Sequence, residues 1–235
     1  MQAKAALFDV FGTVVDWRRG VAEALAPVFD AKRIRADAHA FADAWRAEYQ
    51  PAMERVRSGA RGYVPLDMLH LENLGRALEA FGLADAVDAA ERAALNTAWE
   101  RLPAWPDAAE WLAALRRGMI VAPCSNGSIA LMVRLARHAG LGWDCVLGAD
   151  IARAYKPDPA VYLASADTLG LAGEEGAMVA AHNDDLAAAR ALGFRTAVVP
   201  RPGEHGPDQT TDLAPAADWD AVAEDLRDLA RRLGA

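Results

Sequence analysis

Four short apolar runs alternate with helical stretches in the second half of this chain, and this pattern constrains its fold more than any other feature. The runs lie at 119–124, 144–148, 177–181 and 195–199, and the helical stretches at 107–117, 128–138, 158–169 and 185–192. Strands that alternate with helices form βαβ units, which assemble into a parallel sheet covered by helices. The sequence therefore predicts an α/β fold with a Rossmann-like parallel-sheet core.

A further apolar run near the start of the chain adds one strand to this sheet. It covers residues 5–9 and ends at a turn signal, Phe11-Gly12-Thr13. The segment from 16 to 99 is helical instead, because its apolar residues recur at spacings of three and four. Two such series are Phe41, Trp45, Tyr49, Met53 and Val56, and Leu71, Leu74, Leu78 and Phe81. We predict an α/β core from 1–15 and 100–235, with an all-helical insertion at 16–99.

The composition suits a globular protein with a sizeable core. The chain has 235 residues, of which 53% are hydrophobic and 25% charged, and its formal net charge is -8. Nucleic acids and anionic membranes attract surfaces rich in Lys and Arg, so this acidic balance argues against both as partners. A small anionic molecule would need a local cationic site on such a chain.

The two cysteines, Cys124 and Cys145, are too few for a disulfide framework and fit a reducing compartment. Cys124 ends an apolar run, which favours a buried, inert thiol over a reactive one. The opening residues Met1-Gln-Ala-Lys-Ala contain no long apolar segment, and no stretch approaches the roughly 18 apolar residues of a membrane span. We therefore expect a cytoplasmic protein.

Polar side chains follow the apolar runs where the predicted strands end. Asp9 closes the first run, and Ser125 and Asn126 close the second. Lys156 follows the third run, and the cluster His182-Asn183-Asp184-Asp185 follows the fourth. Ligands of open parallel sheets bind at the carboxyl ends of the strands. The convergence of these residue types on one edge of the sheet predicts an active site there.

In their order and spacing, these residues resemble the four motifs of the haloacid dehalogenase superfamily. The first motif is similar to Phe8-Asp9-Val10-Phe11-Gly12-Thr13-Val14, the second to Ser125-Asn126-Gly127 and the third to Lys156-Pro157. Asp185, with Ala188-Ala189-Arg190-Ala191-Leu192-Gly193-Phe194 behind it, resembles the fourth. The resemblance covers the whole predicted core. It implies a haloacid dehalogenase-like fold in which the helical insertion is a cap subdomain.

Two positions separate this chain from most members of that superfamily, which are Mg-dependent phosphatases. Those phosphatases carry a second Asp two residues after the nucleophile, where this chain has Phe11. Ala180 stands where they place a metal-binding acid, and Mg²⁺ prefers oxygen ligands. Asp184 beside Asp185 keeps a magnesium-dependent phosphatase open as an alternative. The resemblance favours the L-2-haloacid dehalogenase branch, which implies no metal and no other cofactor.

That branch implies hydrolysis of small 2-haloalkanoic acids through an ester on Asp9. A carboxylate is already ionised at pH 7, so Asp9 would displace halide from C2 without an activating base and with inversion. Water would then attack the ester carbonyl and release a 2-hydroxy acid, which is covalent catalysis in two steps. Lys156 would favour the ionised form of Asp9, and Asp185 would orient Lys156 or the water.

Two other functions remain open for the same residues. A related metal-free hydrolase acting on another small 2-substituted acid would use the same ester. A non-catalytic binding or regulatory protein on this scaffold is the second, although the intact Asp9, Ser125, Lys156 and Asp185 argue against it.

The resemblance also implies substrate-binding residues, which are Phe11, Thr13, Arg46, Ser125 and Asn126. The substrate carboxylate would be bound by Ser125, by the lysine of the third motif and by free backbone N–H groups after Asn126. The halide would be bound by Asn126 and Arg46. A solvated helix arginine is the alternative for Arg46, because the same region contains Arg18, Arg19, Arg35, Arg55 and Arg57.

His182 departs from the asparagine that many members of the branch carry at this position. A histidine titrates near neutral pH and would assist either ester hydrolysis or the departure of a halide such as fluoride. A loop histidine that only orients its neighbours is equally consistent with the sequence. The remaining histidines show no metal-ligand spacing and receive no chemical role; they are His39, His70, His138 and His205.

Two further expectations concern the surface of the protein. The segment 200–216 is rich in Pro and Gly and is expected to be a loop that reaches over a site. Exposed helices of the insertion would allow a homodimer.

Overall fold

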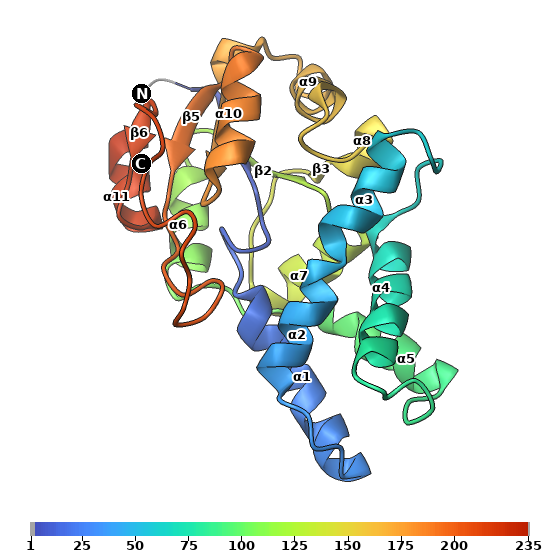
Figure 1. Ribbon diagram of the computed structural model, residues 1–235. Helices are drawn as coiled ribbons and strands as arrows, with labels where there is room; N and C mark the ends of the chain where they lie inside the picture. Colours follow the sequence, from blue (N-terminus) through green and yellow to red (C-terminus); the bar gives the residue numbers. More distant parts are fainter. Residues whose placement is uncertain (1–2, 235) are drawn as a thin grey trace.

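The computed structural model describes residues 3–234 (Figure 1), so residues 1, 2 and 235 of the predicted core lie outside the description. Six parallel strands form one sheet in the order β3-β2-β1-β4-β5-β6. They are β1 (Ala5–Phe8), β2 (Ile120–Ser125), β3 (Leu147–Gly148), β4 (Gly176–Ala180), β5 (Arg195–Val198) and β6 (Ala221–Val222). The predicted α/β class is confirmed, and β1 lies between β2 and β4 near the middle of the sheet.

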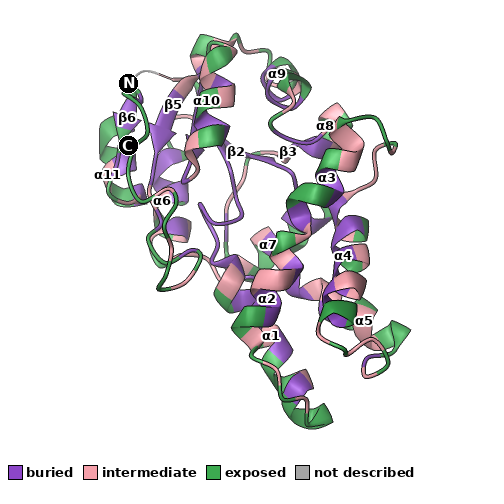
Figure 2. Cartoon of the chain, in the orientation of Figure 1, coloured by how far each residue is buried: buried purple, intermediate pink, exposed green. Residues whose placement is uncertain are grey.

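Both faces of the sheet are buried, because helices cover each of them (Figure 2). Leu7 and Met178 belong to the hydrophobic cluster beneath α9 and α10. Phe8 and Val179, one residue further along their strands, belong to the cluster on the other face, with α6, α7 and α11. The bounds of these helices are α6 (Ala108–Leu115), α7 (Ile129–Ala139), α9 (Pro159–Thr168), α10 (Asn183–Ala191) and α11 (Leu226–Leu233).

Between β1 and α6 the described chain forms helices and no strand. These helices lie together on one side of the sheet, at the lower right in Figure 1. Their buried faces, which include Phe41, Trp45 and Trp99, join the same hydrophobic cluster as Phe8. They are α1 (Trp17–Lys32), α2 (Ala38–Ala47), α3 (Tyr49–Arg57), α4 (Leu66–Ala80), α5 (Ala89–Asn96) and η1 (Thr97–Glu100). Two short helices lie elsewhere, α8 (Ala149–Ala152) and η2 (Gly173–Glu175).

Two expectations about the later elements need correction. The strand expected at 144–148 is reduced to the two residues of β3. The spacing of Val222, Leu226, Leu229 and Leu233 predicts a final amphipathic helix. Val222 instead pairs with β5 as part of β6, and the helix begins at Leu226 after an Asp225 cap. A two-residue strand has too little apolar alternation to be separated from a following helix.

The expectations of a loop at 200–216 and of a buried Cys124 are confirmed. The segment 200–216 contains neither helix nor strand. Cys124 is fully buried, and burial raises the pKa of its thiol to about 11. None of the helices within residues 3–234 combines the length and the apolar character that crossing a membrane requires.

Candidate active site

Asp9 lies one residue beyond β1, at the carboxyl edge of the sheet. Its backbone N–H donates to Val179 O over 2.9 Å, which ties it to the neighbouring strand β4. Lys156 Nζ lies 3.0 Å from its Oδ1, and Thr13 Oγ1 donates to its Oδ2 over 2.8 Å. His182 Nδ1 lies 3.1 Å from the same Oδ2. The carboxylate, which is 8% exposed, therefore has three hydrogen-bond partners from three separate segments.

Lys156 joins Asp9 to a second carboxylate on the same side. Its Nζ lies 2.5 Å from Asp185 Oδ2, and Asp185 Oδ1 accepts a hydrogen bond of 2.5 Å from Tyr162 Oη. The sequence interpretation did not include Tyr162. Its position in the first turns of α9, six residues after Lys156, was the available signal, but a helix phenol facing a sheet usually reads as packing.

These buried charges stabilise one another. Burial alone would raise the pKa of Asp9, but Lys156 and then His182 hold that pKa well below its usual range. Burial opposes the charge of Lys156, yet Asp185 and Asp9 raise its pKa well above the ordinary value. The pKa of Asp185 is raised by burial and by the nearby Asp9 despite the pull of Lys156. Asp9 is therefore ionised at neutral pH beside a permanent ammonium.

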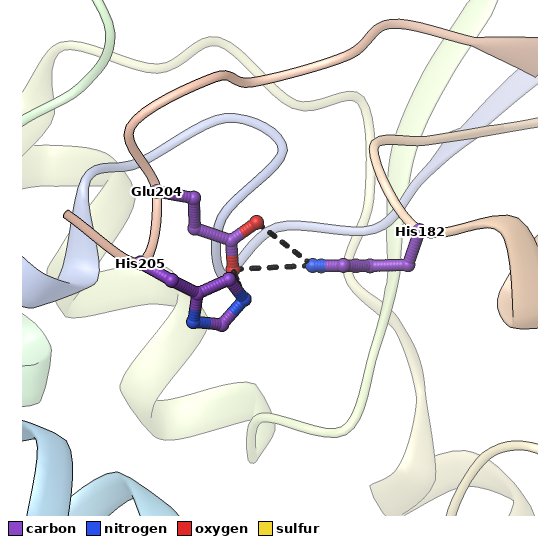
Figure 3. A group of neighbouring side chains, drawn as sticks. All are labelled: His182, Glu204 and His205. Atoms are coloured by element: carbon purple, nitrogen blue, oxygen red, sulfur yellow. Dashed lines mark hydrogen bonds and ion pairs between the residues drawn. The ribbon is translucent and has the colours of Figure 1, made fainter. Parts of the chain in front are cut away.

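His182 lies on the other side of Asp9, and a second carboxylate faces it there (Figure 3). Its Nε2 lies 3.1 Å from Oε1 and 3.0 Å from Oε2 of Glu204. Glu204 and His205 extend from the loop opposite His182. Trp17 Nε1 also donates to Glu204 Oε1, over 2.9 Å. Burial opposes the charge of His182, but Glu204 and then Asp9 raise its pKa well above the usual value.

Besides Tyr162, sequence reasoning missed Glu204 and His205. His205 received no chemical role, yet its Nε2 lies 3.6 Å from Glu204 Oε1. Within the described part of the chain, one group of side chains has the composition of a metal site: His182, Glu204 and His205. Their possible ligand atoms lie within 4.8 Å of one another. We read the group as ion pairs, since His182 has its second nitrogen on Asp9 and the charges match. A Glu-His dipeptide in an irregular loop offered no periodic signal.

A cavity of about 810 Å³ opens above these groups. Its wall includes all four residues predicted to be catalytic, together with Phe11, Arg46 and Asn126 from the predicted substrate-binding set. Arg46 Cζ lies 3.8 Å from the centre of the Tyr49 ring. Its Nη1 is buried and has no hydrogen-bond partner among the described residues. A guanidinium held against aromatic rings with a free donor is suited to bind an anion.

The other predicted substrate-binding residues lie beneath the cavity wall. Thr13 is fully buried; its Oγ1 donates to Asp9 and accepts from Ala181 N–H over 2.9 Å. Ser125 is also fully buried, and its Oγ accepts the Gly127 N–H over 3.0 Å. The backbone N–H groups expected to be free after Asn126 therefore need a correction, because the first of them is already bonded to Ser125.

Asn126 is fixed in orientation by Lys156. Its Oδ1 accepts the backbone N–H of Lys156 over 2.8 Å, which leaves the NH₂ group as the donor end of the amide. The side chain is among those that line the cavity. The structure thus brings the predicted halide ligands Asn126 and Arg46 to the same cavity as Asp9.

Together, the fold and these contacts define a class of protein: an α/β protein with a buried, cation-paired carboxylate at the carboxyl edge of a parallel sheet. The haloacid dehalogenase-like hydrolase family model matches residues 3–193, and the chain belongs to this family. The (S)-2-haloacid dehalogenase 4A of Burkholderia cepacia is 32% identical over 85% of this chain and 84% of that relative.

Solved structures agree with this assignment. The defluorinating L-2-haloacid dehalogenase Rha0230 has a TM-score of 0.97 and 49% identity, and the match covers 99% of this chain and 96% of that one. The L-2-haloacid dehalogenase from Xanthobacter autotrophicus with chloropropionic acid covalently bound has a TM-score of 0.83 and 26% identity, with 100% of both chains covered. The predicted resemblance to the L-2-haloacid dehalogenase branch is confirmed.

Proposed function

We propose that this protein hydrolyses small 2-haloalkanoic acids to 2-hydroxy acids through an aspartyl ester on Asp9. The observation that carries this proposal is the ionised Asp9 carboxylate with Lys156 on one oxygen and Phe11 on the nearby cavity wall. A halide leaves without a proton, so the absence of an acid at Phe11 does not impair the reaction. The relatives named above act on, or bind, substrates of this kind.

Substrate binding follows from the cations of the cavity. Arg46 has a free buried donor, and the amide of Asn126 faces the same space. We assign the departing halide to these two groups and the substrate carboxylate to the neighbourhood of Lys156. Phe11 forms an apolar wall beside C2, and Thr13 holds Asp9 in orientation. Ser125 remains a predicted substrate ligand. Because it is buried and bonded to Gly127, the loop after β2 must shift before Ser125 can contact the substrate.

The catalytic roles follow from the contacts of Asp9. Lys156 keeps the nucleophile ionised, and Asp185, oriented by Tyr162, holds Lys156 in place. His182 has both ring nitrogens near carboxylates, which favours a role in ester hydrolysis over a role in halide departure. No metal enters this mechanism, since the Lys156 ammonium lies between the two carboxylates where a cation would otherwise be held.

The wider setting of the enzyme is part of the same proposal. The helical segment 16–99 acts as a cap subdomain on the core formed by 1–15 and 100–235, and the enzyme works in the cytoplasm. Exposed apolar side chains on the neighbouring helices α4 and α7, such as Met68 and Val133, support a homodimer. An anionic small molecule is its partner in catalysis, and neither nucleic acid nor membrane is involved.

Halide release from (S)-2-chloropropionate in the presence of EDTA tests this function. The proposal expects chloride and (R)-lactate in equal amounts, with no turnover by Asp9→Asn. A Mg²⁺-dependent phosphatase would instead hydrolyse p-nitrophenyl phosphate and lose its activity in EDTA. Full dehalogenation by Asp9→Asn would overturn the proposal.

A further inference from the structure

Glu204 is built into the site although it comes from an irregular loop. It is 1% exposed, whereas Asp9 and Asp185 are each 8% exposed. Trp17 holds one of its oxygens, and Arg201 Nε anchors the same loop to Thr13 O over 2.9 Å. Burying an unpaired charge is costly, and His182 supplies the opposite charge for this carboxylate.

Gly12 permits this close approach. Its φ is +90°, and a Cβ at this position would lie 2.0 Å from Glu204 Oε1. The nucleophile loop therefore accepts the carboxylate only because residue 12 is glycine. The carboxylate, in turn, lies beside the loop that carries Asp9 and contacts His182 on the far side.

The contacts of His182 determine its proton count. Nδ1 faces Asp9 Oδ2 and Nε2 faces Glu204, and an ionised carboxylate can only accept hydrogen bonds. Both ring nitrogens must therefore donate, so His182 is an imidazolium in the resting enzyme. When Asp9 becomes an ester it loses its charge, while Glu204 still requires the proton on Nε2. Only the Nδ1 proton loses an ionised acceptor, because esterified Asp9 is neutral.

We propose that Glu204 is a positioning residue that makes His182 a base only while Asp9 is esterified. This inference rests on the proposed function. In the ester, Glu204 holds the proton on Nε2, and His182 releases the Nδ1 proton to solvent. The Nδ1 lone pair then faces the ester, where the attacking water must be deprotonated. In the free enzyme Nδ1 of His182 carries a proton and cannot act as this base.

The protons balance over the cycle. Asp9 forms a bond to C2 as the carbon–halogen bond breaks, and the halide leaves with the bonding electrons. His182 then releases one proton. Water adds to the ester carbonyl and gives a proton to Nδ1. The bond between Cγ and the Asp9 oxygen that carries C2 then breaks, and the resulting alkoxide takes the remaining proton of the added water. The sum is one halide, one 2-hydroxy acid and one proton, with His182 again an imidazolium.

The groups that face His182 support this sequence. Asp9 and Glu204 are its two carboxylate partners; Lys156 reaches the other oxygen of Asp9, and His205 lies 3.6 Å from Glu204. Both the charge of Asp9 and its hydrogen bond raise the pKa of His182, and both weaken in the ester. Among the described side chains that contact the ring, Glu204 is then the one ionised acceptor.

The timing of proton release tests the proposal. The complete protein is mixed with excess (S)-2-chloropropionate in a weakly buffered indicator, and halide, proton and 2-hydroxy acid are followed before steady state. We expect about one proton per active site to appear after the halide and before the 2-hydroxy acid. A proton that appears only with the 2-hydroxy acid would overturn the inference. If no halide appears at all, the proposed function itself fails.

Glu204→Gln tests the positioning role. Gln keeps an oxygen for Trp17, but its NH₂ group would turn toward Nε2 of His182, so a neutral ring would carry its proton on Nδ1. We expect the halide burst to persist and ester hydrolysis to slow roughly 100-fold, the usual scale of general-base catalysis. The esterified protein would accumulate in mass spectra, and higher pH would not restore turnover.

Gln209→Ala is the matched control, because it disturbs the conformation of the same loop without changing Glu204. Gln209 Oε1 accepts the backbone N–H groups of Gly203 and His205, over 2.9 Å and 3.1 Å, but it does not contact His182. We expect this variant to keep the wild-type ratio of halide burst to turnover. Equal loss in both variants would reduce Glu204 to a structural residue, as would unchanged hydrolysis in Glu204→Gln.

Discussion

The two oxygens of Asp9 have surroundings of different character. Oδ1 faces Lys156, whose ammonium also contacts Asp185 and is 6% exposed. Oδ2 faces Thr13 and His182, and beyond the ring lies Glu204 on a loop. One side thus offers a cation that cannot lose its charge near neutral pH, and the other offers a cation that we propose loses its charge once Asp9 is esterified.

In the proposed mechanism, this difference separates the two chemical steps. Alkylation requires an ionised carboxylate, which the permanent charge of Lys156 provides. Ester hydrolysis requires a base, which only the titratable side provides. Variants on the Lys156 side should therefore impair the first step, and variants on the His182 side should impair the second.

Lys156→Met should have the largest effect. It leaves Asp9 and Asp185 buried without their cation, and losing one partner of a buried pair costs about 3–5 kcal/mol. We expect unfolding at lower temperature and loss of the halide burst by roughly a thousandfold, which corresponds to about 4 kcal/mol. Stopped-flow halide detection and thermal unfolding measure the two effects.

Lys4→Met is the control for this substitution. Lys4 pairs with Glu175 at the surface, with its side chain 67% exposed. Exposed pairs of this kind contribute little, so both activity and melting temperature should stay close to wild type. A halide burst that survived in Lys156→Met would contradict the role given to the Lys156 side.

His182→Gln should have the next largest effect, and on the other step. Removing the base should leave the halide burst in place and lower steady-state turnover by about 100-fold. Mass spectrometry of the quenched protein should find Asp9 esterified. His138→Gln, on the exposed surface of α7, should change neither quantity. If His182→Gln also lost the halide burst, the Lys156 side and the His182 side would not act on separate steps.

Tyr162→Phe should have a smaller effect on the Lys156 side. It removes the hydrogen bond to ionised Asp185, and bonds to charged groups contribute about 1.5–3 kcal/mol. The pKa of Asp185 is already raised in the folded protein and should rise further, so the acid limb of kcat/KM should move to higher pH. A pH profile of kcat/KM measures this shift.

Tyr63→Phe is a matched control for Tyr162→Phe. Tyr63 donates a hydrogen bond of 2.5 Å to Asp150, as Tyr162 does to Asp185, but it lies outside the cavity. The acid limb of its kcat/KM profile should not move. If both variants shift that limb equally, the Tyr162 contact has no special part in the site.

His70 shows what burial does to a histidine without carboxylates, and replacing it should have the smallest effect. It is 1% exposed, and neither ring nitrogen has a hydrogen-bond partner among the described residues. Burial and then Arg46 hold its pKa well below the ordinary value of 6.5. Below about pH 6.5 the unfolded chain therefore binds a proton that the folded protein does not bind. As a result, the free energy of unfolding decreases as the pH is lowered.

His70→Leu should remove this sensitivity to acid. We expect a gain on the order of 1 kcal/mol near pH 8, because a buried unsatisfied polar group is lost, and a larger gain at pH 5.5. Chemical unfolding at the two pH values measures the difference. His138→Leu, at an exposed position, should show no such pH-dependent gain, and the same gain there would contradict the argument.

The sequence predicted the Lys156 side of the site better than the His182 side. Asp9, Lys156 and Asp185 follow strands or start helices, and a parallel sheet brings such positions to one edge whatever the loop lengths. The convergence of these residues was therefore readable from strand order alone. Arg46 was harder to identify: the family resemblance implied it, and it adjoins Trp45, which lies with Phe41 on the buried face of α2.

Glu204 could not be predicted for a physical reason. Its position depends on the path of 200–216, which is set by single contacts such as Arg201 with Thr13 and Asp212 with Asn183. No periodicity records contacts of that kind. The buried positions of Thr13 and Ser125 also depend on loop geometry, so motif matching assigned them to the substrate without showing what covers them.

The central claim is that Asp9 itself attacks carbon, and single-turnover hydrolysis in ¹⁸O water tests it directly. Enzyme in excess over (S)-2-chloropropionate is digested after one turnover, and the Asp9 peptide and the lactate are weighed. Water that opens an aspartyl ester leaves its oxygen on the carboxylate, so we expect ¹⁸O in Asp9 and unlabelled lactate. Label in the lactate and none in Asp9 would mean that water attacks the substrate directly.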